Sequence, residues 1–459
     1  MLQIPSGQSA AESSRPTHTR DVFAIAGPAM LANMTTPLIG VVATAAIGRL
    51  GDAALLGGVA MATVIFDCLF WLFGFLRMST VAFTAQALGA GQRHEFPVLL
   101  ARALLLACLI GLALIIFQRP LADAVFRAMG GSEAVTHAAH AYLTVRIWSA
   151  PLVLSNYVIL GWLVGQARAF LALAIQVVID IVSMALTVAF VLTLNWGVAG
   201  AAAASLIAEA GGLVLGLAIA WRLLDRTFSV TAESLFDRAK LLRLMAVNRD
   251  ILLRTAALVT ALLFFSAQGA RAGDTTLAAN AVLQNLLMVS AFFLDGLASA
   301  AQQLCGRTYG ARNRAGFAGA TRITLGWGFG FSVAVALVLF VFGPGLIDAM
   351  TSSGEVRRIA RDFLWLAALA PLVSVFAFVF DGIYIGATWS RDMRNLMVLS
   401  LLSYLAMWFA LQPFGNTGLW IAYLTFYAAR GALQALRYPS LLRASFPDAR
   451  PATPASPRP

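Results

Sequence analysis

The 459-residue sequence has little charge: 12% of its residues are Asp, Glu, Lys or Arg, whereas 60% are hydrophobic. A water-soluble domain usually devotes about a quarter of its residues to charge. Apolar runs of ~20 residues, long enough to cross a bilayer as a helix, recur along the whole chain. The composition therefore excludes a soluble protein and predicts an all-α integral membrane protein.

Cysteine and histidine are also scarce, with three and four residues respectively. Cys68, Cys108 and Cys305 lie inside apolar runs without a pairing spacing, so the sequence indicates neither a disulfide nor a metal. His137 and His140 have helical spacing but no further ligands nearby, so we expect no metal there either. HExxH, GxSxG and GxxxxGK[ST] patterns are missing, so we expect no cofactor and no enzymatic activity.

Acidic residues are outnumbered, 21 against 32 Lys and Arg, which gives a net charge of +11. The arginines are scattered in loops between spans, as the positive-inside rule produces, so we expect no nucleic-acid partner. The charge bias of alternating loops places both termini in the cytoplasm.

We predict twelve spans in two six-helix lobes. The spans are expected at 22–46, 54–80, 97–117, 136–163, 168–193, 198–221, 248–270, 276–303, 317–346, 360–386, 394–412 and 417–440. The predicted domains are a cytoplasmic tail (1–20), the N-lobe (21–221), a cytoplasmic interlobe loop (222–247), the C-lobe (248–441) and a disordered C-terminal tail (442–459).

The two halves repeat one another at a nearly constant offset. Matching pairs are Gly51-Asp52 with Gly273-Asp274, Gly89-Ala90 with Gly310-Ala311, Pro151-Leu152-Val153 with Pro371-Leu372-Val373, and Gly197 with Gly415. A repeat of six spans keeps its orientation in the membrane, so a pseudo-twofold axis along the membrane normal should relate the lobes. Transporters of that build hold the substrate between the lobes and rock them alternately.

The first span contains two prolines, Pro28 and Pro37, each of which removes a backbone donor and clashes with the preceding turn. In lipid, a broken helix is tolerated only where protein or a water-filled cavity covers the freed backbone groups. We therefore predict that Pro28 and Pro37 form a hinge that lines a hydrated cavity.

Several stretches, taken together, resemble the multidrug and toxic compound extrusion (MATE) family and, within it, the DinF-like branch. The densest are PLIGVVATAAIGRLG (37–51), FWLFGFLRMSTVAFTAQALGAG (70–91), FFLDGLASAAQQLCGRTYGAR (292–312) and DGIYIGAT (381–388). The resemblance implies a monomer in the lipid bilayer of the bacterial inner membrane. It also implies export of organic cations or other small amphiphiles, driven by inward flow of protons or sodium.

This chain departs from the family at three acidic positions. DinF-like members carry an aspartate near the outer end of the first span, fifteen residues after the bend-forming proline, where this chain has Ala43. An aspartate of the fifth span is Thr187 here, and a glutamate of the eighth span is Gln302. The usual proton site therefore does not carry over directly.

Four aspartates remain inside the spans as candidates for ion or proton coupling. An aspartate at mid-bilayer costs ~2.5–3.5 kcal/mol on insertion scales, so each needs a reason. Asp180 shares a helical stripe with Thr187 and either replaces the family's acid or joins helices by a hydrogen bond. Asp67 lies among aromatics that suit a cation, or forms an interfacial salt bridge. Asp295 and Asp381 match acidic positions that the resemblance preserves.

Uncharged residues expected to line the substrate cavity are Asn33, Thr36, Met34, Phe66, Phe70, Gln284, Asn285 and Gln302. Methionine and phenylalanine supply the adaptable apolar wall of promiscuous binders, although such residues also fill cores. The polar members alternatively form hydrogen bonds between helices.

We predict a secondary antiporter that exports amphiphilic, chiefly cationic drugs or toxic compounds in exchange for protons or sodium, by alternating access. One charge crossing 100 mV supplies ~2.3 kcal/mol for this work. Two alternatives stay open. One is a flippase for lipid-linked precursors, which would need a basic central cavity, and the other is an uncoupled membrane scaffold or intramembrane enzyme.

Overall fold

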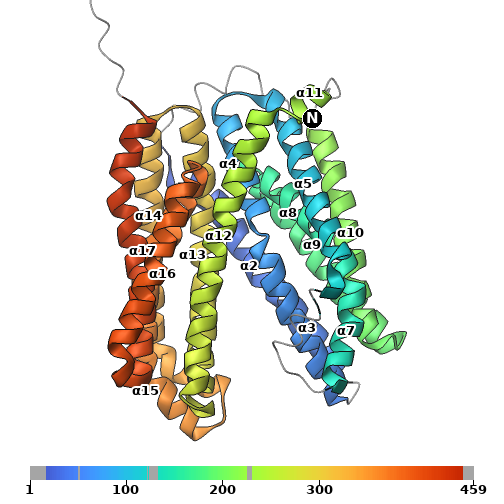
Figure 1. The fold of residues 1–459 in the computed structure, drawn as a ribbon, viewed down its shortest axis with the longest axis vertical. Helices are drawn as coiled ribbons and strands as arrows, with labels where there is room; N and C mark the ends of the chain where they lie inside the picture. Colours follow the sequence, from blue (N-terminus) through green and yellow to red (C-terminus); the bar gives the residue numbers. More distant parts are fainter. Residues whose placement is uncertain (1–16, 50–51, 121, 123–132, 225–229, 448–459) are drawn as a thin grey trace, which may run out of the picture.

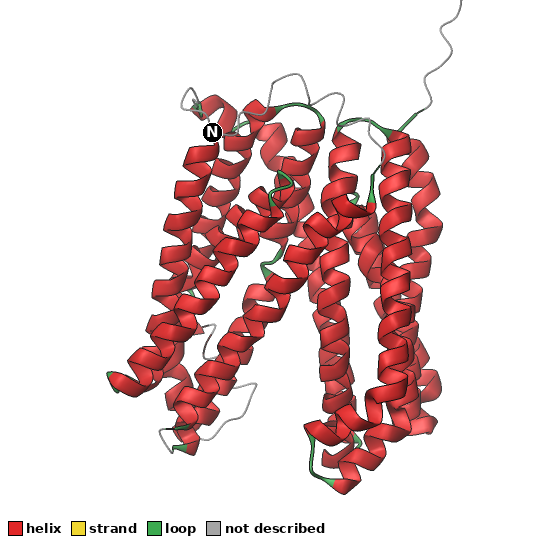
Figure 2. Cartoon of the chain, turned by 180° about the vertical axis from the view of Figure 1, so that it is seen from behind, coloured by secondary structure: helices red, strands yellow, loops and turns green. Residues whose placement is uncertain are grey.

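The computed structural model describes residues 17–49, 52–120, 122, 133–224 and 230–447 (Figure 1). Across these residues the chain forms helices joined by short turns, with no strand (Figure 2). The predicted all-α fold is confirmed.

Eight long helices lie in the described residues of the N-lobe, and some of them pair into one bent span. They are α2 (Thr19–Gly48), α3 (Ala53–Leu72), α4 (Phe75–Gly89), α5 (Phe96–Ile116), α7 (Glu133–Arg146), α8 (Ala150–Gly165), α9 (Ala169–Val188) and α10 (Gly197–Leu223). The break between α3 and α4 falls at Phe73-Gly74, and α7 passes into α8 through the 3-10 turn Ile147–Ser149 just before Pro151. A proline is well tolerated at the start of a helix, so α8 begins there.

A short connecting helix and the C-lobe follow. They are α11 (Ala232–Leu235), α12 (Arg238–Arg271), α13 (Asp274–Gly310), α14 (Arg314–Met350), α15 (Gly354–Gly386), α16 (Ser390–Leu411) and α17 (Gly415–Ser445). Helix α12 begins well before residue 248, inside the segment expected to be a loop. Helical hydrogen bonds do not require an apolar sequence, so helices continue past the hydrocarbon boundary that hydropathy detects.

Eleven helical segments of the described chain are long and apolar enough to cross a membrane. The last of them, Ser390–Ser445, holds two helices, α16 and α17, separated by the 3-10 turn Gln412–Phe414. Counting these separately gives the twelve spans that the sequence predicts.

The helices form two bundles, and Figure 1 shows α2 running obliquely between them. We call the end that carries α11 the linker end and the opposite end the far end. The two lobes lie against each other near the linker end and diverge toward the far end. Contacts between α4 and α13 and between α2 and α13 join the lobes.

Reciprocal close contacts reveal the symmetry that relates the lobes. A Cβ atom on Gly89 of α4 would lie 1.8 Å from the carbonyl oxygen of Arg307 on α13. A Cβ atom on Gly310 of α13 would lie 2.0 Å from the carbonyl oxygen of Gln86 on α4. Gly310 and Arg307 follow Gly89 and Gln86 by the same offset of 221 residues. Contacts that repeat with their partners exchanged are what a twofold axis requires, so the predicted pseudo-twofold relation is confirmed.

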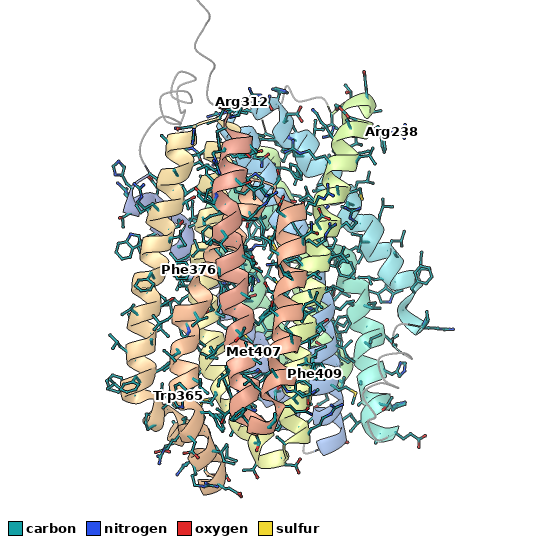
Figure 3. All side chains as sticks on the ribbon, turned by 60° about the vertical axis from the view of Figure 1, so that its left-hand side comes forward. Arg238, Arg312, Trp365, Phe376, Met407 and Phe409 are labelled. Carbon is teal, nitrogen blue, oxygen red and sulfur yellow. The ribbon has the colours of Figure 1, made fainter. Side chains whose placement is uncertain are left out.

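The outer surface of the bundle is apolar. Trp365, Phe376 and Phe409 point away from the helices (Figure 3) and have 51%, 39% and 66% of their surface exposed. Large exposed aromatic side chains are unfavourable in water but suit contact with lipid. This exposure fits the integral membrane fold.

Candidate functional site

Asp180 links the proline-containing helix to the N-lobe. The residue lies on α9 and is 1% exposed. Its carboxylate accepts one hydrogen bond from Thr35 Oγ1 at 2.7 Å and another from Gln176 Nε2 at 2.8 Å. Thr35 lies on α2 between Pro28 and Pro37, both of which the structure places inside one helix. A single carboxylate thus connects α9 to the part of α2 where the sequence predicts a hinge.

Asp180 differs from the other buried aspartates of the described chain. These are Asp250 and Asp381, and each forms ion pairs with arginine. Asp180 is hydrogen-bonded by neutral groups alone. A buried carboxylate without a cationic partner can gain or lose a proton without leaving an arginine uncompensated. A proton carrier needs this property.

A small cavity of about 40 Å³ is lined by Gln176, one of the hydrogen-bond donors to Asp180. Its lining includes Pro28 and Asn33 of α2, Gln176 of α9, Arg77 of α4 and Ser299 of α13. A polar space of this size has room for a water molecule. The cavity therefore places a hydratable space between the Asp180 hydrogen bonds and the C-lobe.

Asp381 on α15 is held by two arginines. Its Oδ2 accepts hydrogen bonds from Arg254 of α12 and Arg430 of α17, and its Oδ1 accepts one from Gln434 Nε2 at 2.7 Å. All four side chains are buried. Sequence reasoning took Arg254 for part of the charged interlobe segment and missed Arg430. An arginine inside an apolar run requires an acidic partner, and that signal could have found both.

Asp295 extends this charged cluster toward the N-lobe. It lies on α13, is exposed, and interacts electrostatically with Arg254, Arg430 and Asp381 of its own lobe. It also interacts with the charge of Arg77 on α4. Asp295 thus lies within electrostatic range of arginines from both lobes.

Asp67 on α3 is exposed and lies in the electrostatic range of Arg146 on α7. The Arg146 guanidinium also lies over the rings of Phe66 and Phe70, 5.9 and 5.8 Å from their centroids. The two rings are themselves stacked at 5.4 Å. In this conformation the two rings predicted to bind a cation are therefore occupied by Arg146 of the protein itself.

Two of the predicted cavity residues form hydrogen bonds between the lobes. Asn33 Nδ2 of α2 donates to the carbonyl of Phe292 on α13 at 3.2 Å, and Gln302 Nε2 of α13 donates to the carbonyl of Met78 on α4. Both bonds must break if the lobes separate there. These residues therefore contribute to the stability of this conformation.

Four predicted cavity residues remain, and the described side chains among them differ in their exposure. Met34 on α2 is 44% exposed, and Asn285 on α13 is exposed. Gln284 is half-buried, and its Nε2 has no hydrogen-bond partner among the described residues. The side chain of Thr36 lies outside the described part of the chain.

Two pseudo-symmetric six-helix lobes with acids buried in their spans define a secondary transporter built from repeats. The MatE family profile matches residues 28–212 and 251–409, so the chain belongs to the MATE family of multidrug efflux transporters. Members of this family are transporters and not enzymes, as the sequence predicts.

Two relatives support the assignment. The chain is 36% identical to DNA damage-inducible protein F of Escherichia coli strain K12 over 409 residues, which are 89% of each chain. It is 26% identical to multidrug resistance protein NorM of Vibrio cholerae, over 86% of this chain and 91% of that one. The resemblance to the DinF-like branch is therefore confirmed.

Solved structures share the fold. A multidrug resistance MATE family transporter of the MOP superfamily, in an outward-facing conformation, matches with a TM-score of 0.85 and 18% identity, over 96% of this chain and 99% of that one. A MATE protein in its straight conformation matches with a TM-score of 0.86, 19% identity and the same coverage.

Proposed function

We propose that this protein is a proton-coupled antiporter that exports amphiphilic, chiefly cationic compounds across a bacterial inner membrane, with Asp180 as the proton-binding group. Both termini are in the cytoplasm in this proposal, because basic residues concentrate at the linker end. Sodium is the alternative coupling ion.

The hydrogen bonding of Asp180 carries the proposal. A charged carboxylate accepts the hydrogen bonds from Thr35 and Gln176 that are observed. When Asp180 is protonated, its hydroxyl donates to Thr35 Oγ1 and the Thr35 hydroxyl donates instead to the carbonyl of Ala32, 3.0 Å away, so the hydrogen bond reverses its direction. Because Thr35 lies between the two prolines of α2, the proton state of Asp180 is transmitted to the most deformable part of that helix. Proton binding then favours one arrangement of the lobes, as coupling requires.

Charge also favours a cationic substrate. In the middle of its spans, the N-lobe carries the acids Asp67, Asp180 and Glu209 and the bases Arg77 and Arg146. A third base, Arg102, lies on α5 at the linker end, where it donates hydrogen bonds to carbonyls at the end of α11. The Glu209 carboxylate accepts a hydrogen bond from a neutral amide, at 2.7 Å. Away from the linker end the lobe thus has one excess carboxylate, which a bound organic cation or a proton compensates. Competition between the two is the simplest form of antiport.

Transport in proteoliposomes tests the assignment. With an imposed pH gradient, we expect Asp180→Asn to lower ethidium transport at least tenfold and to make the residual flux independent of the gradient. Asp348→Asn is the matched control, because Asp348 is half-exposed, pairs with Arg361, and lies at the far end. Asp381→Asn is measured alongside.

The outcomes separate the alternatives. Gradient-driven transport that survives in Asp180→Asn would contradict proton coupling through Asp180, and its loss in Asp381→Asn alone would move the assignment to Asp381. Transport driven by a sodium gradient at equal pH, and lost in Asp180→Asn, would assign the same residue to sodium. Flux that ignores both gradients in the unmodified protein would leave an uncoupled carrier.

A further inference from the structure

A second cavity, of about 850 Å³, lies at the linker end and is separate from the Asp180 site. Its walls come from both lobes: α4 and α5 on one side, and α12, α13 and the end of α17 on the other. Its volume lies within the ~300–1,000 Å³ that is usual for ligand sites. The residues that line this cavity take no part in the proton binding proposed above.

The lining of the cavity is amphiphilic and strongly basic. Five basic residues face a single acid, Glu95; they are Arg102, Lys240, Arg243, Arg312 and Arg314. The apolar part of the wall includes Phe83, Leu99 and Phe446. A cavity of this kind suits a ligand with an anionic group and an apolar part.

Several of these basic side chains are fixed in place by contacts within the protein. Arg102 donates hydrogen bonds to carbonyls at the end of α11, and Lys240 pairs with Glu95. Arg243 donates to Gln86 Oε1 at 3.2 Å, and its guanidinium lies 5.4 Å from the Phe83 ring centroid. These contacts therefore hold basic side chains of both lobes at defined positions in the cavity wall.

Arg312 is a residue of this wall that differs from its counterpart in the other lobe. Its φ is +53°, in the left-handed region that side chains disfavour. Its counterpart in the internal repeat is Gly91, where glycine adopts φ +71° without strain. The C-lobe thus keeps an arginine where the same turn of the N-lobe has glycine. The labelled side chain lies at the linker end of the bundle (Figure 3). Ala167 and Thr388 also have positive φ, so a binding role for Arg312 rests on its place in the basic wall of the cavity.

We propose that this cavity binds a phosphate-bearing anion, with Arg312 contributing to its affinity. The apolar wall favours the head group of an anionic phospholipid over a soluble phosphate compound, because basic pockets between membrane helices bind such head groups. The site does not depend on the proton site proposed above. Because its walls belong to both lobes, an occupant stabilises the conformation in which the lobes meet at the linker end.

Thermal unfolding of the full-length protein in detergent, followed by tryptophan fluorescence, tests the proposal. The probes are phosphatidylglycerol, phosphatidylcholine with the same acyl chains, and inorganic phosphate. A ligand of the folded state raises Tm with concentration. We expect phosphatidylglycerol to raise Tm more than phosphatidylcholine does, and Arg312→Gly to weaken that response about fivefold, the factor equivalent to ~1 kcal/mol per basic residue at a membrane surface.

Three further variants make the result interpretable. Glycine suits the backbone at position 312, so Arg312→Gly should fold, and Arg312→Gln supplies a second uncharged variant. Arg312→Lys keeps the charge and should retain the response. Arg391→Gln removes an exposed arginine at the start of α16, outside the cavity lining, and should behave as the unmodified protein.

Each possible result either supports or contradicts the proposal. A response to inorganic phosphate equal to that of phosphatidylglycerol, and lost in Arg312→Gly, supports the anion site with a soluble source. Equal responses to phosphatidylglycerol and phosphatidylcholine without any phosphate response would overturn the proposal. So would an undiminished phosphatidylglycerol response in Arg312→Gly or Arg312→Gln.

Discussion

At the scale of single residues, the partners of each buried acid decide what its protonation would do. Protonation of Asp381 would leave Arg254 and Arg430 buried without a counter-charge, which is costly in a low-dielectric interior. Protonation of Asp180 would leave only Thr35 and Gln176, which are neutral and can reorient. For that reason Asp180 suits a titrating role, and the Asp381 cluster suits the architecture of the C-lobe.

This distinction predicts unequal stability losses in the C-lobe. Asp381→Asn removes the one carboxylate that both arginines bind, whereas Arg430→Met leaves Asp381 paired with Arg254. Breaking a buried ion pair costs ~3–5 kcal/mol when one charge is left alone. We therefore expect a clearly larger fall in thermal stability for Asp381→Asn than for Arg430→Met, measured by tryptophan fluorescence in detergent.

The control for that comparison is Asp348→Asn, which removes the partner of Arg361 at a half-exposed ion pair. Pairs of that kind contribute ~0–1 kcal/mol, so little change is expected. An Arg430→Met protein as unstable as Asp381→Asn would show that the cluster is not organised around the carboxylate.

The acids of the site could be predicted from the sequence, but their partners could not. An aspartate in an apolar run is visible at once, because burial of its charge is expensive. Which group compensates it depends on how the helices pack: Asp381 meets Arg254 across 127 residues, and Asp180 meets Thr35 across 145. No local pattern encodes such a pairing.

At the scale of helices, α2 is one of the elements that contact both lobes. Through Asn33 it contacts the carbonyl of Phe292 on α13, and two residues later, through Thr35, it contacts Asp180 on α9. A change in the α2 bend therefore strains one contact or the other. Adjacent contacts of this kind provide a physical connection between a proton site in one lobe and the packing of the other.

Helices α4 and α13 cross closely at the linker end because the glycines at the crossing have no side chains. Because a Cβ at position 310 would lie 2.0 Å from the carbonyl oxygen of Gln86, Gly310→Ala must push the two helices apart. We expect this variant to populate conformations in which the lobes are separated at the linker end. Spin labels on Gln92→Cys and Arg391→Cys, in a background without native cysteines, should report a longer distance by pulsed electron paramagnetic resonance.

Gly319→Ala is the matched control for Gly310→Ala. Gly319 lies on α14 of the same lobe, and nothing comes within 4 Å of a Cβ built there. Its distance distribution should equal that of the parent protein. An unchanged distribution in Gly310→Ala would show that the crossing has more slack than the backbone positions indicate.

At the scale of the whole molecule, the internal repeat was the most informative sequence signal. Matched glycines at a nearly constant offset predicted two related lobes. In the structure, two of these glycines form reciprocal contacts across the interface between the lobes. The lengths of the helices were less predictable. Apolar content marks where a helix enters hydrocarbon, but α12 and α13 continue beyond their apolar runs, where hydropathy gives no signal.

Alternating access requires the lobes to part at the linker end during every cycle, and a covalent link across that end tests this requirement. Gln86 Nε2 of α4 lies 3.4 Å from Thr388 Oγ1 in the C-lobe. We expect Gln86→Cys with Thr388→Cys, joined by a reducible cross-linker, to lose ethidium transport at least tenfold and to recover it on reduction. A link between Cys305 and Thr321→Cys, 3.8 Å apart in Sγ to Oγ1 distance within the C-lobe, should leave transport intact. Transport that continues through the interlobe link would mean that substrate passes without separation of the lobes at this end.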